Sequence, residues 1–154
     1  MIQANPNKIK EIVREFFKKT GLPLEVEVDG LQESTIPVNI KTEEPQLLIG
    51  ERGQTLMETQ GLLRSVLRKQ LGFQERFYVD LDVNDYKKKK AEYLREMAKS
   101  VADEVTLTKT EKQLPPMSPY ERRIIHTELA SRSDIITESI GEGPQRRVII
   151  KIQL

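Results

Sequence analysis

Apolar residues near the N-terminus recur with the period of a helix. Their spacing is i, i+3, i+4, i+7 and i+8, which predicts an amphipathic helix over residues 7–19. Residues 24–28 and 36–40 then alternate between apolar and polar side chains, as half-buried strands do. Pro37 has no backbone N–H to donate, so we expect this second strand to be an edge strand or to begin irregularly.

A short apolar helix, 46–49, is predicted next, and the loop Gly50–Gly53 ends it. A longer helix follows from Gln54 to about Leu71, and alternation over residues 77–81 predicts a third strand. The predicted order of this half is therefore helix, strand, strand, helix, helix, strand.

The second half begins with a long helix from about Asn84 to Val105 and a short extended piece at residues 113–114. Ser118-Pro119-Tyr120-Glu121 is a strong helix start, and that helix is predicted to end near Ser131. Strands are predicted over 135–140 and 147–152, joined by a hairpin at residues 141–144. The apolar residues predicted to face inward on the long helix are Tyr93, Leu94, Met97, Val101 and Val105.

The two halves differ in element order, so they are not a duplication. The sequence predicts an α+β protein with two small domains, residues 1–83 and residues 84–154. No apolar run reaches the roughly 20 residues that cross a bilayer, and the first ten residues have no apolar signal-peptide core. These features predict a cytoplasmic protein with no membrane insertion.

The chain has no cysteine and one histidine, which excludes disulfides and argues against a zinc site. We predict no metal, no cofactor and no catalytic residue. The net charge of +1 favours no partner by itself, but residues 85–99 hold six bases and three acids. The run Lys87, Lys88, Lys89 and Lys90 there either attracts phosphate or is simply a solvated helix face.

The Gly50-Glu51-Arg52-Gly53 segment, which we call the GERG loop, separates the short helix from the long one. Glycine allows close backbone approach, and a helix N-terminus offers N–H groups that suit phosphate oxygens. Arg52 would add a charge-assisted contact. The alternative is a tight helix–helix turn without a ligand. The candidate RNA-binding residues here are Ile49, Gly50, Glu51, Arg52, Gly53 and Gln54.

This element order, with Leu47-Leu48-Ile49-Gly50-Glu51-Arg52-Gly53-Gln54-Thr55-Leu56 around the loop, resembles the second-type KH domain of bacteria. The resemblance implies a clamp for about four unpaired nucleotides, with the bases on an apolar groove. The groove candidates are Ile49, Leu56, Val38 and Ile40. Glu51 departs from the family, which more often has a basic residue there, and its charge should weaken phosphate attraction.

Arg122 and His126 are four residues apart, so they lie one turn apart on one face of the capped helix. They and Arg123 could donate to one phosphate. The alternative is that His126 caps a neighbouring carbonyl or carboxylate and only supports the fold.

Glu121-Arg122-Arg123-Ile124-Ile125-His126, followed by Thr137-x-Ser139-x-Gly141 and Pro144-x-Arg146-Arg147-Val148, resembles the R-three-H domain over roughly residues 85–152. The resemblance implies about three strands against two helices, and binding of single-stranded nucleic acid through the Arg and His of the motif. Arg146 and Arg147 would extend that face. Whether His126 contacts the ligand or supports the site stays open.

A KH domain followed by an R-three-H domain resembles the bacterial Jag (SpoIIIJ-associated) family. That resemblance implies an RNA chaperone or post-transcriptional regulator linked to cell-envelope synthesis, elongation and division. It also implies a small KH-only protein partner or a homodimer, and we expect this chain to lack the family's extra N-terminal domain. Single-stranded RNA is the expected ligand, with DNA as the other candidate strand.

Two other functions are open from the sequence. A nuclease could use His126 with Glu121 or Glu128 as acid and base. A protein–protein or ribosome-associated adaptor could use the same domains without strong RNA binding, and its affinity would survive salt.

Overall fold

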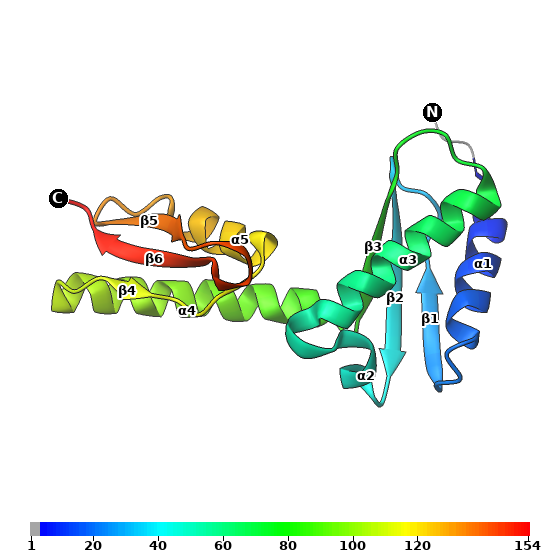
Figure 1. Cartoon of the computed structure of the whole chain (residues 1–154), viewed down its shortest axis with the longest axis horizontal. Coiled ribbons are helices and arrows are strands. Elements are labelled where there is room, and N and C mark those ends of the chain that lie inside the picture. The colour runs from blue at the N-terminus through cyan, green and yellow to red at the C-terminus, as the bar shows by residue number, and fades with distance from the viewer. Residues whose placement is uncertain (1–3) are drawn as a thin grey trace. The chain divides into compact units, whose positions relative to one another are not determined.

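The computed structural model describes residues 4–154, in two compact units that meet in the sequence between Lys87 and Lys88 (Figure 1). Residues 1–3, the start of the first predicted domain, lie outside the described residues. Each unit contains helices packed on a three-stranded sheet, so the predicted α+β class is confirmed. The compact first unit runs to Lys87, whereas the predicted boundary lies after residue 83.

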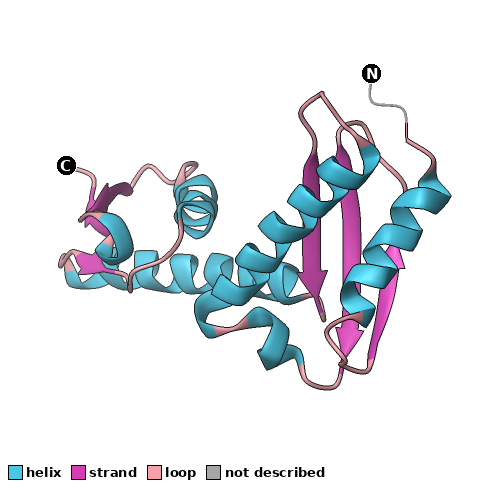
Figure 2. Ribbon diagram, turned by 45° about the vertical axis from the view of Figure 1, so that its right-hand side comes forward, coloured by secondary structure: helices cyan, strands magenta, loops and turns pink. Residues whose placement is uncertain are grey.

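The first unit has the element order that the sequence predicts. Its elements are α1 (Pro6–Lys18), β1 (Leu24–Val28), β2 (Thr35–Thr42), α2 (Pro45–Ile49), the 3₁₀ turn η1 (Glu51–Gly53), α3 (Gln54–Leu71) and β3 (Tyr78–Val83). The sheet order is β1-β2-β3, antiparallel and then parallel. Helices α1 and α3 lie on the same face of this sheet (Figure 2). Phe17, Leu63, Phe77 and Ile36 are fully buried in the core between these layers.

β2 is the central strand of the sheet, so the prediction that Pro37 marks an edge strand is wrong. The carbonyl oxygen of Pro37 accepts a hydrogen bond from the N–H of Asp29, one residue beyond the end of β1. The polar backbone groups of a strand residue face the same neighbouring strand, so the proline nitrogen also faces the place where β1 stops. The missing N–H therefore removes one bond at the end of a ladder and leaves the pairing with β3 intact.

The second unit holds two helices and three strands, as predicted. Its elements are α4 (Tyr86–Thr108), which begins within the first unit, β4 (Lys112–Gln113), α5 (Pro119–Leu129), β5 (Ile135–Ile140), the 3₁₀ turn η2 (Gly143–Gln145) and β6 (Arg147–Ile152). The sheet is antiparallel with the order β4-β6-β5. The hairpin between β5 and β6 and the capping box at Ser118 and Glu121 are confirmed.

The buried side of α4 differs from the prediction at Tyr93, which is 60% exposed and lies under the Lys90 ammonium at 5.6 Å. Small residues take several of the inward positions, and Ala98 and Ala102 are fully buried. Our pattern counted large apolar residues and therefore missed the alanines. The buried α4 residues of the second core are Leu94, Ala98, Ala102 and Val105.

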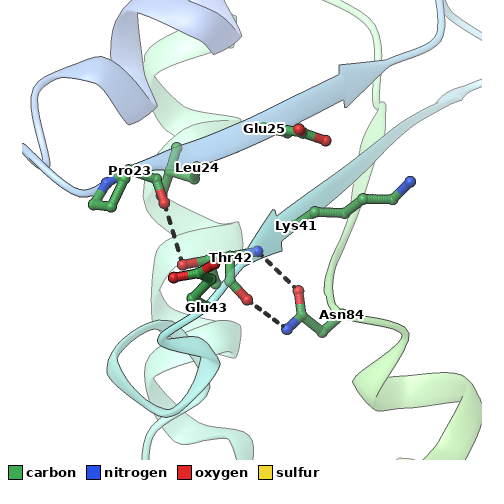
Figure 3. Close-up of a pocket in the computed structure, with 7 residues that line it drawn as sticks. All are labelled: Pro23, Leu24, Glu25, Lys41, Thr42, Glu43 and Asn84. Carbon is green, nitrogen blue, oxygen red and sulfur yellow. Dashed lines mark hydrogen bonds between the residues drawn. The ribbon is translucent and has the colours of Figure 1, made fainter.

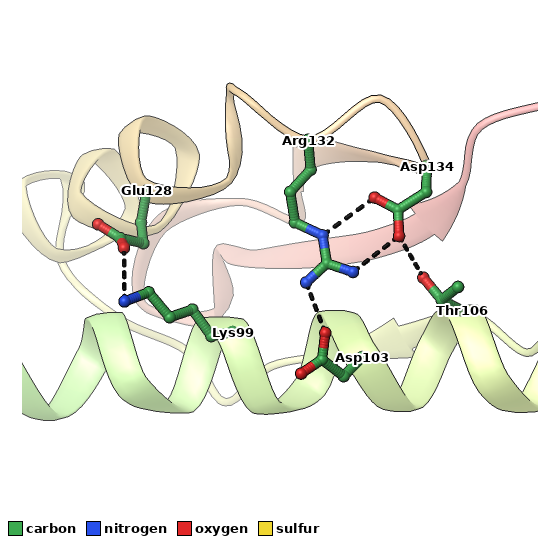
Figure 4. Close-up of polar contacts among 6 residues, drawn as sticks. All are labelled: Lys99, Asp103, Thr106, Glu128, Arg132 and Asp134. Atoms are coloured by element: carbon green, nitrogen blue, oxygen red, sulfur yellow. Dashed lines mark hydrogen bonds and ion pairs between the residues drawn. The ribbon is translucent and has the colours of Figure 1, made fainter.

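Polar contacts tie α4 to the segment between α5 and β5 (Figure 4). The Arg132 guanidinium donates to Asp134 and to Asp103, each at 2.7 Å, and the Thr106 hydroxyl donates to Asp134 at 2.8 Å. The hydrogen bonds from Arg132 and then Thr106 hold the pKa of Asp134 well below its usual range. Within residues 4–154, every helix is too short or too polar to cross a bilayer.

Candidate nucleic-acid interface

The GERG loop turns through three residues with positive φ. Gly50, Arg52 and Gly53 have φ values of 72°, 54° and 78°, and Gly53 is the residue that precedes α3. No side chain caps the first turn of α3. The Gln54 N–H donates to the Glu51 carbonyl within η1, and the helix dipole makes this end favourable for an acceptor from outside. Glu51, Arg52 and Gln54 are exposed, Ile49 and Gly50 are half-buried, and Gly53 is buried.

Packing explains both glycines of the loop. A Cβ added at Gly53 would lie 3.1 Å from Cε1 of Tyr86, and one added at Gly50 would overlap the side chain of Thr55. The left-handed backbone also costs other residues roughly 1–2 kcal/mol. Arg52 adopts that conformation without being glycine, which is a local strain of the kind found at functional sites. Tyr86, near the start of α4, was not among the residues that the sequence placed at this loop.

Three of the four predicted groove residues are buried and belong to the core. Val38, Ile40 and Leu56 are at most 1% exposed, so they cannot present an apolar surface to bases. Ile49 remains half-buried beside the loop. The error arises because a strand's period of two identifies the apolar face but does not say whether helices cover it. Here α1 and α3 cover it.

A hollow of about 740 Å³ opens where β1 begins and β2 ends (Figure 3). At its edge the Asn84 side chain accepts from the N–H of Thr42 at 3.0 Å and donates to the Thr42 carbonyl at 2.8 Å. The amide thereby extends the β2–β3 pairing beyond the end of β3. The charged lining consists of Glu25, Glu43 and Lys41. Since acids exceed bases there, the hollow is poorly suited to phosphate.

In the second unit, His126 of α5 contacts two hydroxyls of β5. Its Nδ1 lies 2.7 Å from Thr137 Oγ1 and its Nε2 lies 2.8 Å from Ser139 Oγ. Both ring nitrogens are thus engaged, and contact with a ligand would require one of these bonds to break. The geometry favours the supporting role for His126 over direct contact. Its partners are hydroxyls, whereas the sequence suggested a carbonyl or carboxylate.

The surroundings of His126 favour the neutral imidazole over the protonated one. Burial lowers the pKa of His126 below its ordinary value of 6.5, and the nearby positive charge of Arg122 lowers it further. Arg122 donates through Nη1 to the carbonyl oxygen of Met117 at 2.8 Å. A guanidinium carries five N–H groups, so Arg122 keeps donors for a phosphate while this bond fixes its position.

Arg146 and Arg147, the other arginines predicted for this face, lie in different places. The Met117 N–H donates to the carbonyl of Arg146 at 3.2 Å, which brings Arg146 beside the residue that anchors Arg122. Arg147 pairs with Ile140 in the register, one position from the Ser139–Val148 pair. Because side chains alternate along a strand, Arg147 lies on the face opposite buried Val148 and the His126 contacts. It does not extend the Arg122 face as expected, and its contact with RNA stays a prediction.

Arg123 and the lysine run have different surroundings. Arg123 is exposed and lines a small cleft between α4 and α5 with Tyr120 and Arg95. Lys87 is tied down, since its ammonium donates to Gln60 at 2.8 Å and pairs with Asp80 at 3.2 Å. Lys88 and Lys89 follow on α4 and are exposed. The Lys90 ammonium lies over the Tyr93 ring.

Comparison with known protein families identifies the domain type of the second unit. The model of the R-three-H domain matches residues 92–151, which contain the Arg122 and His126 motif. The chain is 36% identical to "RNA-binding protein KhpB" of Clostridium symbiosum over 148 residues, 96% of this chain and 66% of that protein. It is 39% identical to the protein of the same name from Bacillus subtilis (strain 168) over 124 residues, 78% of this chain and 59% of that protein.

A third relative, "RNA-binding protein KhpB" of Lactiplantibacillus plantarum, is 34% identical over 88% of this chain and 41% of its own length. The chain therefore spans between about two fifths and two thirds of these relatives. The similarity runs through both units, because the match to the Clostridium symbiosum protein covers 96% of this chain. With its KH-like element order and its R-three-H domain, this chain belongs to the Jag (KhpB) family.

Proposed function

We propose that this chain binds single-stranded RNA through two sites, the GERG loop of a KH-like domain and the Arg122 face of the R-three-H domain. The observation that carries the proposal is the N-terminus of α3, which no side chain caps and which exposed Arg52 precedes. Backbone donors, helix dipole and guanidinium together suit a phosphate. The relatives' name, RNA-binding protein, supports RNA as the strand.

The second site uses arginines held by backbone carbonyls. Arg122 is anchored on Met117 and Arg146 donates to the Gly141 carbonyl at 2.7 Å, so both guanidinium groups are positioned before a strand arrives. Positioning lowers the entropy that binding must offset. His126 acts here by holding α5 on β5 through Thr137 and Ser139, and Arg123 adds an exposed charge.

We assign the KH-like function to residues 1–83 and the R-three-H function to residues 84–154. The chain passes from one compact unit to the other within α4, at the lysine run. Lys88 and Lys89 add sequence-independent attraction to phosphate there. Two weak sites on one chain hold one strand more tightly than either alone, because the second contact is intramolecular. A role as RNA chaperone or regulator fits such binding.

A non-enzymatic role agrees with where the acidic residues lie. The Glu121 carboxylate accepts the Ser118 N–H within the capping box, and Glu128 pairs with Lys99 at 3.3 Å and Arg95 at 3.9 Å. Neither carboxylate contacts His126, whose nitrogens are occupied by hydroxyls. The acid–base pair that a nuclease would need is therefore poorly supported.

The test is a titration of a fluorescent unstructured RNA of about 20 nucleotides, and its DNA equivalent, at two salt concentrations. We expect binding that weakens as salt rises, since each phosphate contact on a single strand contributes about 0.7 to the log–log slope. Arg52→Asp and Arg122→Gln/Arg123→Gln should each weaken binding, and Glu51→Lys should tighten it. Circular dichroism verifies that each variant folds.

Arg14→Asp is the matched control for Arg52→Asp. It makes the same charge change on exposed α1, away from the loop in sequence and on another element, and should alter affinity less. Affinity that is insensitive to salt and to all three site variants would overturn the proposal in favour of a protein adaptor. A pull-down with a small KH-only protein and a measurement of oligomeric state would then address the proposed partners.

A further inference from the structure

Three arginines surround two aromatic rings at the far end of α3 from the GERG loop. The Arg64 guanidinium lies 5.9 Å from the Phe77 ring centre and 5.7 Å from that of Tyr78. Arg68 lies 5.1 Å from the Phe77 ring, and Arg76 lies 5.6 Å from the Tyr78 ring. We call these five residues the arginine–tyrosine patch. All of them belong to the first unit.

The two rings have different roles in the patch. Phe77 is fully buried, and the Arg64 and Arg68 guanidinium groups lie over its ring. Tyr78, in contrast, is 44% exposed. Tyr78 begins β3, the edge strand of the sheet, and its side chain points away from the face that carries buried Val79. Because the Arg64 and Arg76 guanidinium groups lie over the Tyr78 ring, a base stacks there when one of them moves off the ring to a phosphate.

The local charge is strongly positive. Residues 59–78 hold four bases, Arg64, Arg68, Lys69 and Arg76, against one acid, Glu75. The GERG loop, by contrast, has one base and one acid. The nearest acid along β3, Asp80, is already paired with Lys87. Phosphate attraction in the first unit is therefore greater at this patch than at the loop.

One side of α3 connects the loop to the patch. Gln60, Arg64 and Arg68 are spaced by four residues and so lie on successive turns of the same side. Gln60 accepts from the backbone N–H of Leu81 in β3 at 3.1 Å, which places that side against the edge strand. Ten residues of helix separate Gln54 from Arg64, a rise of about 15 Å. A strand held at the loop reaches the patch by running along this edge.

We propose that the arginine–tyrosine patch is an additional subsite for single-stranded RNA, where one base stacks on Tyr78 and Arg64 and Arg76 contact the adjoining phosphates. The inference rests on the proposed RNA binding and extends it beyond the GERG loop. RNA is favoured over an acidic protein segment because the exposed ring gives a base a stacking partner, whereas a carboxylate would use the arginines alone.

The direct test is the variant Tyr78→Trp in the 154-residue chain, which otherwise has no tryptophan. Unstructured RNA of about 20 nucleotides should quench its fluorescence, because a base stacks on the new ring. Leu62→Trp is the control, since Leu62 is 58% exposed on α3 but two residues from Arg64 and thus on another side. Its fluorescence should change little. Polyglutamate should leave both variants unquenched.

Affinity measurements complete the test. Tyr78→Ala should weaken binding of the same RNA at least about fivefold, while Tyr78→Phe keeps the ring and should retain most of the affinity. Arg64→Gln/Arg76→Gln should lower the salt slope by about 1.4, for two phosphate contacts. Lys69→Gln removes one charge next to the patch without touching either ring, and should cost less than Arg64→Gln alone, which removes an equal charge.

The outcomes separate this inference from the proposed function. RNA that binds normally to Tyr78→Trp without quenching it overturns the subsite and leaves RNA binding intact. Quenching by polyglutamate and not by RNA assigns the patch to an acidic protein partner and also overturns it. Absence of RNA binding by the wild-type chain overturns both proposals together.

Discussion

Gly53 of the GERG loop packs directly against the ring of Tyr86, a residue 33 positions away in the chain. The loop is thereby held from α4 as well as from its own two helices. Tyr86 also packs against the hydrophobic core of the first unit. The open end of α3 is positioned by a contact that no local pattern encodes, and this contact makes the glycine the sensitive position of the loop.

Gly53→Ala should destabilise the chain by about 1–2 kcal/mol from the left-handed backbone alone. The new Cβ must also displace the Tyr86 ring by a few tenths of an ångström, so RNA affinity should fall with stability. Urea unfolding and the RNA titration measure the two effects.

Gly61→Ala provides the control within the same helix. Gly61 is exposed in the interior of α3 with nothing within 4 Å of an added Cβ, so alanine should stabilise by about 0.5–1 kcal/mol. Equal stability changes at the two glycines would contradict the packing argument.

Stability should fall as the pH is lowered through about 6.5, because of His126. The folded state lowers the pKa of His126, so the unfolded chain takes up the proton first and is favoured on acidification. The chain has one histidine, so no other imidazole contributes in this range. Urea unfolding at pH 7.5 and 5.5 measures the loss, and His126→Gln should remove most of the pH dependence.

Nuclear magnetic resonance of the imidazole gives an independent check. We expect its folded pKa to lie below 6.5. A value above 6.5 would mean that the folded protein favours the protonated ring, which is incompatible with burial and the Arg122 charge as the dominant influences.

Arg132→Lys should lower the melting temperature although it keeps the charge. One planar guanidinium bonds both Asp134 and Asp103, and an ammonium cannot reproduce that fork. Lys99→Gln removes an exposed pair with Glu128 and should cost less than about 1 kcal/mol.

The contribution of Asp134 should be present above the ordinary aspartate range and lost as the pH falls below about 4, because its folded pKa is lowered. Thermal melts at pH 7 compare the two variants with the wild type, and melts at pH 7 and pH 3 measure the contribution of Asp134.

Local patterns predicted the elements well. The capping box at Ser118, the strand alternation of β1, β2 and β3, and the glycines around α3 all act within a few residues, so they can be read without knowing the fold. The element order of the first unit and the three-strand, two-helix second unit followed from them. The candidate loop and the Arg122–His126 pair were found in the same way, because their spacing is local.

Tertiary structure decided the partners of these elements and side chains. Pro37 is tolerated on a central strand because β1 stops beside it, and Val38, Ile40 and Leu56 are unavailable to bases because helices cover their face. His126 meets Thr137 and Ser139, and the arginine–tyrosine patch forms, only when distant segments come together.

The sequence by itself therefore determined where the helices and strands lie and which short motifs the chain carries, because backbone propensity and periodicity are properties of neighbouring residues. Only the tertiary structure decided which side chains remain exposed, which donors are already satisfied and which cations meet an aromatic ring. Those outcomes depend on contacts between residues far apart in the chain, such as Tyr86 with Gly53, and periodicity specifies a face without specifying what packs on it.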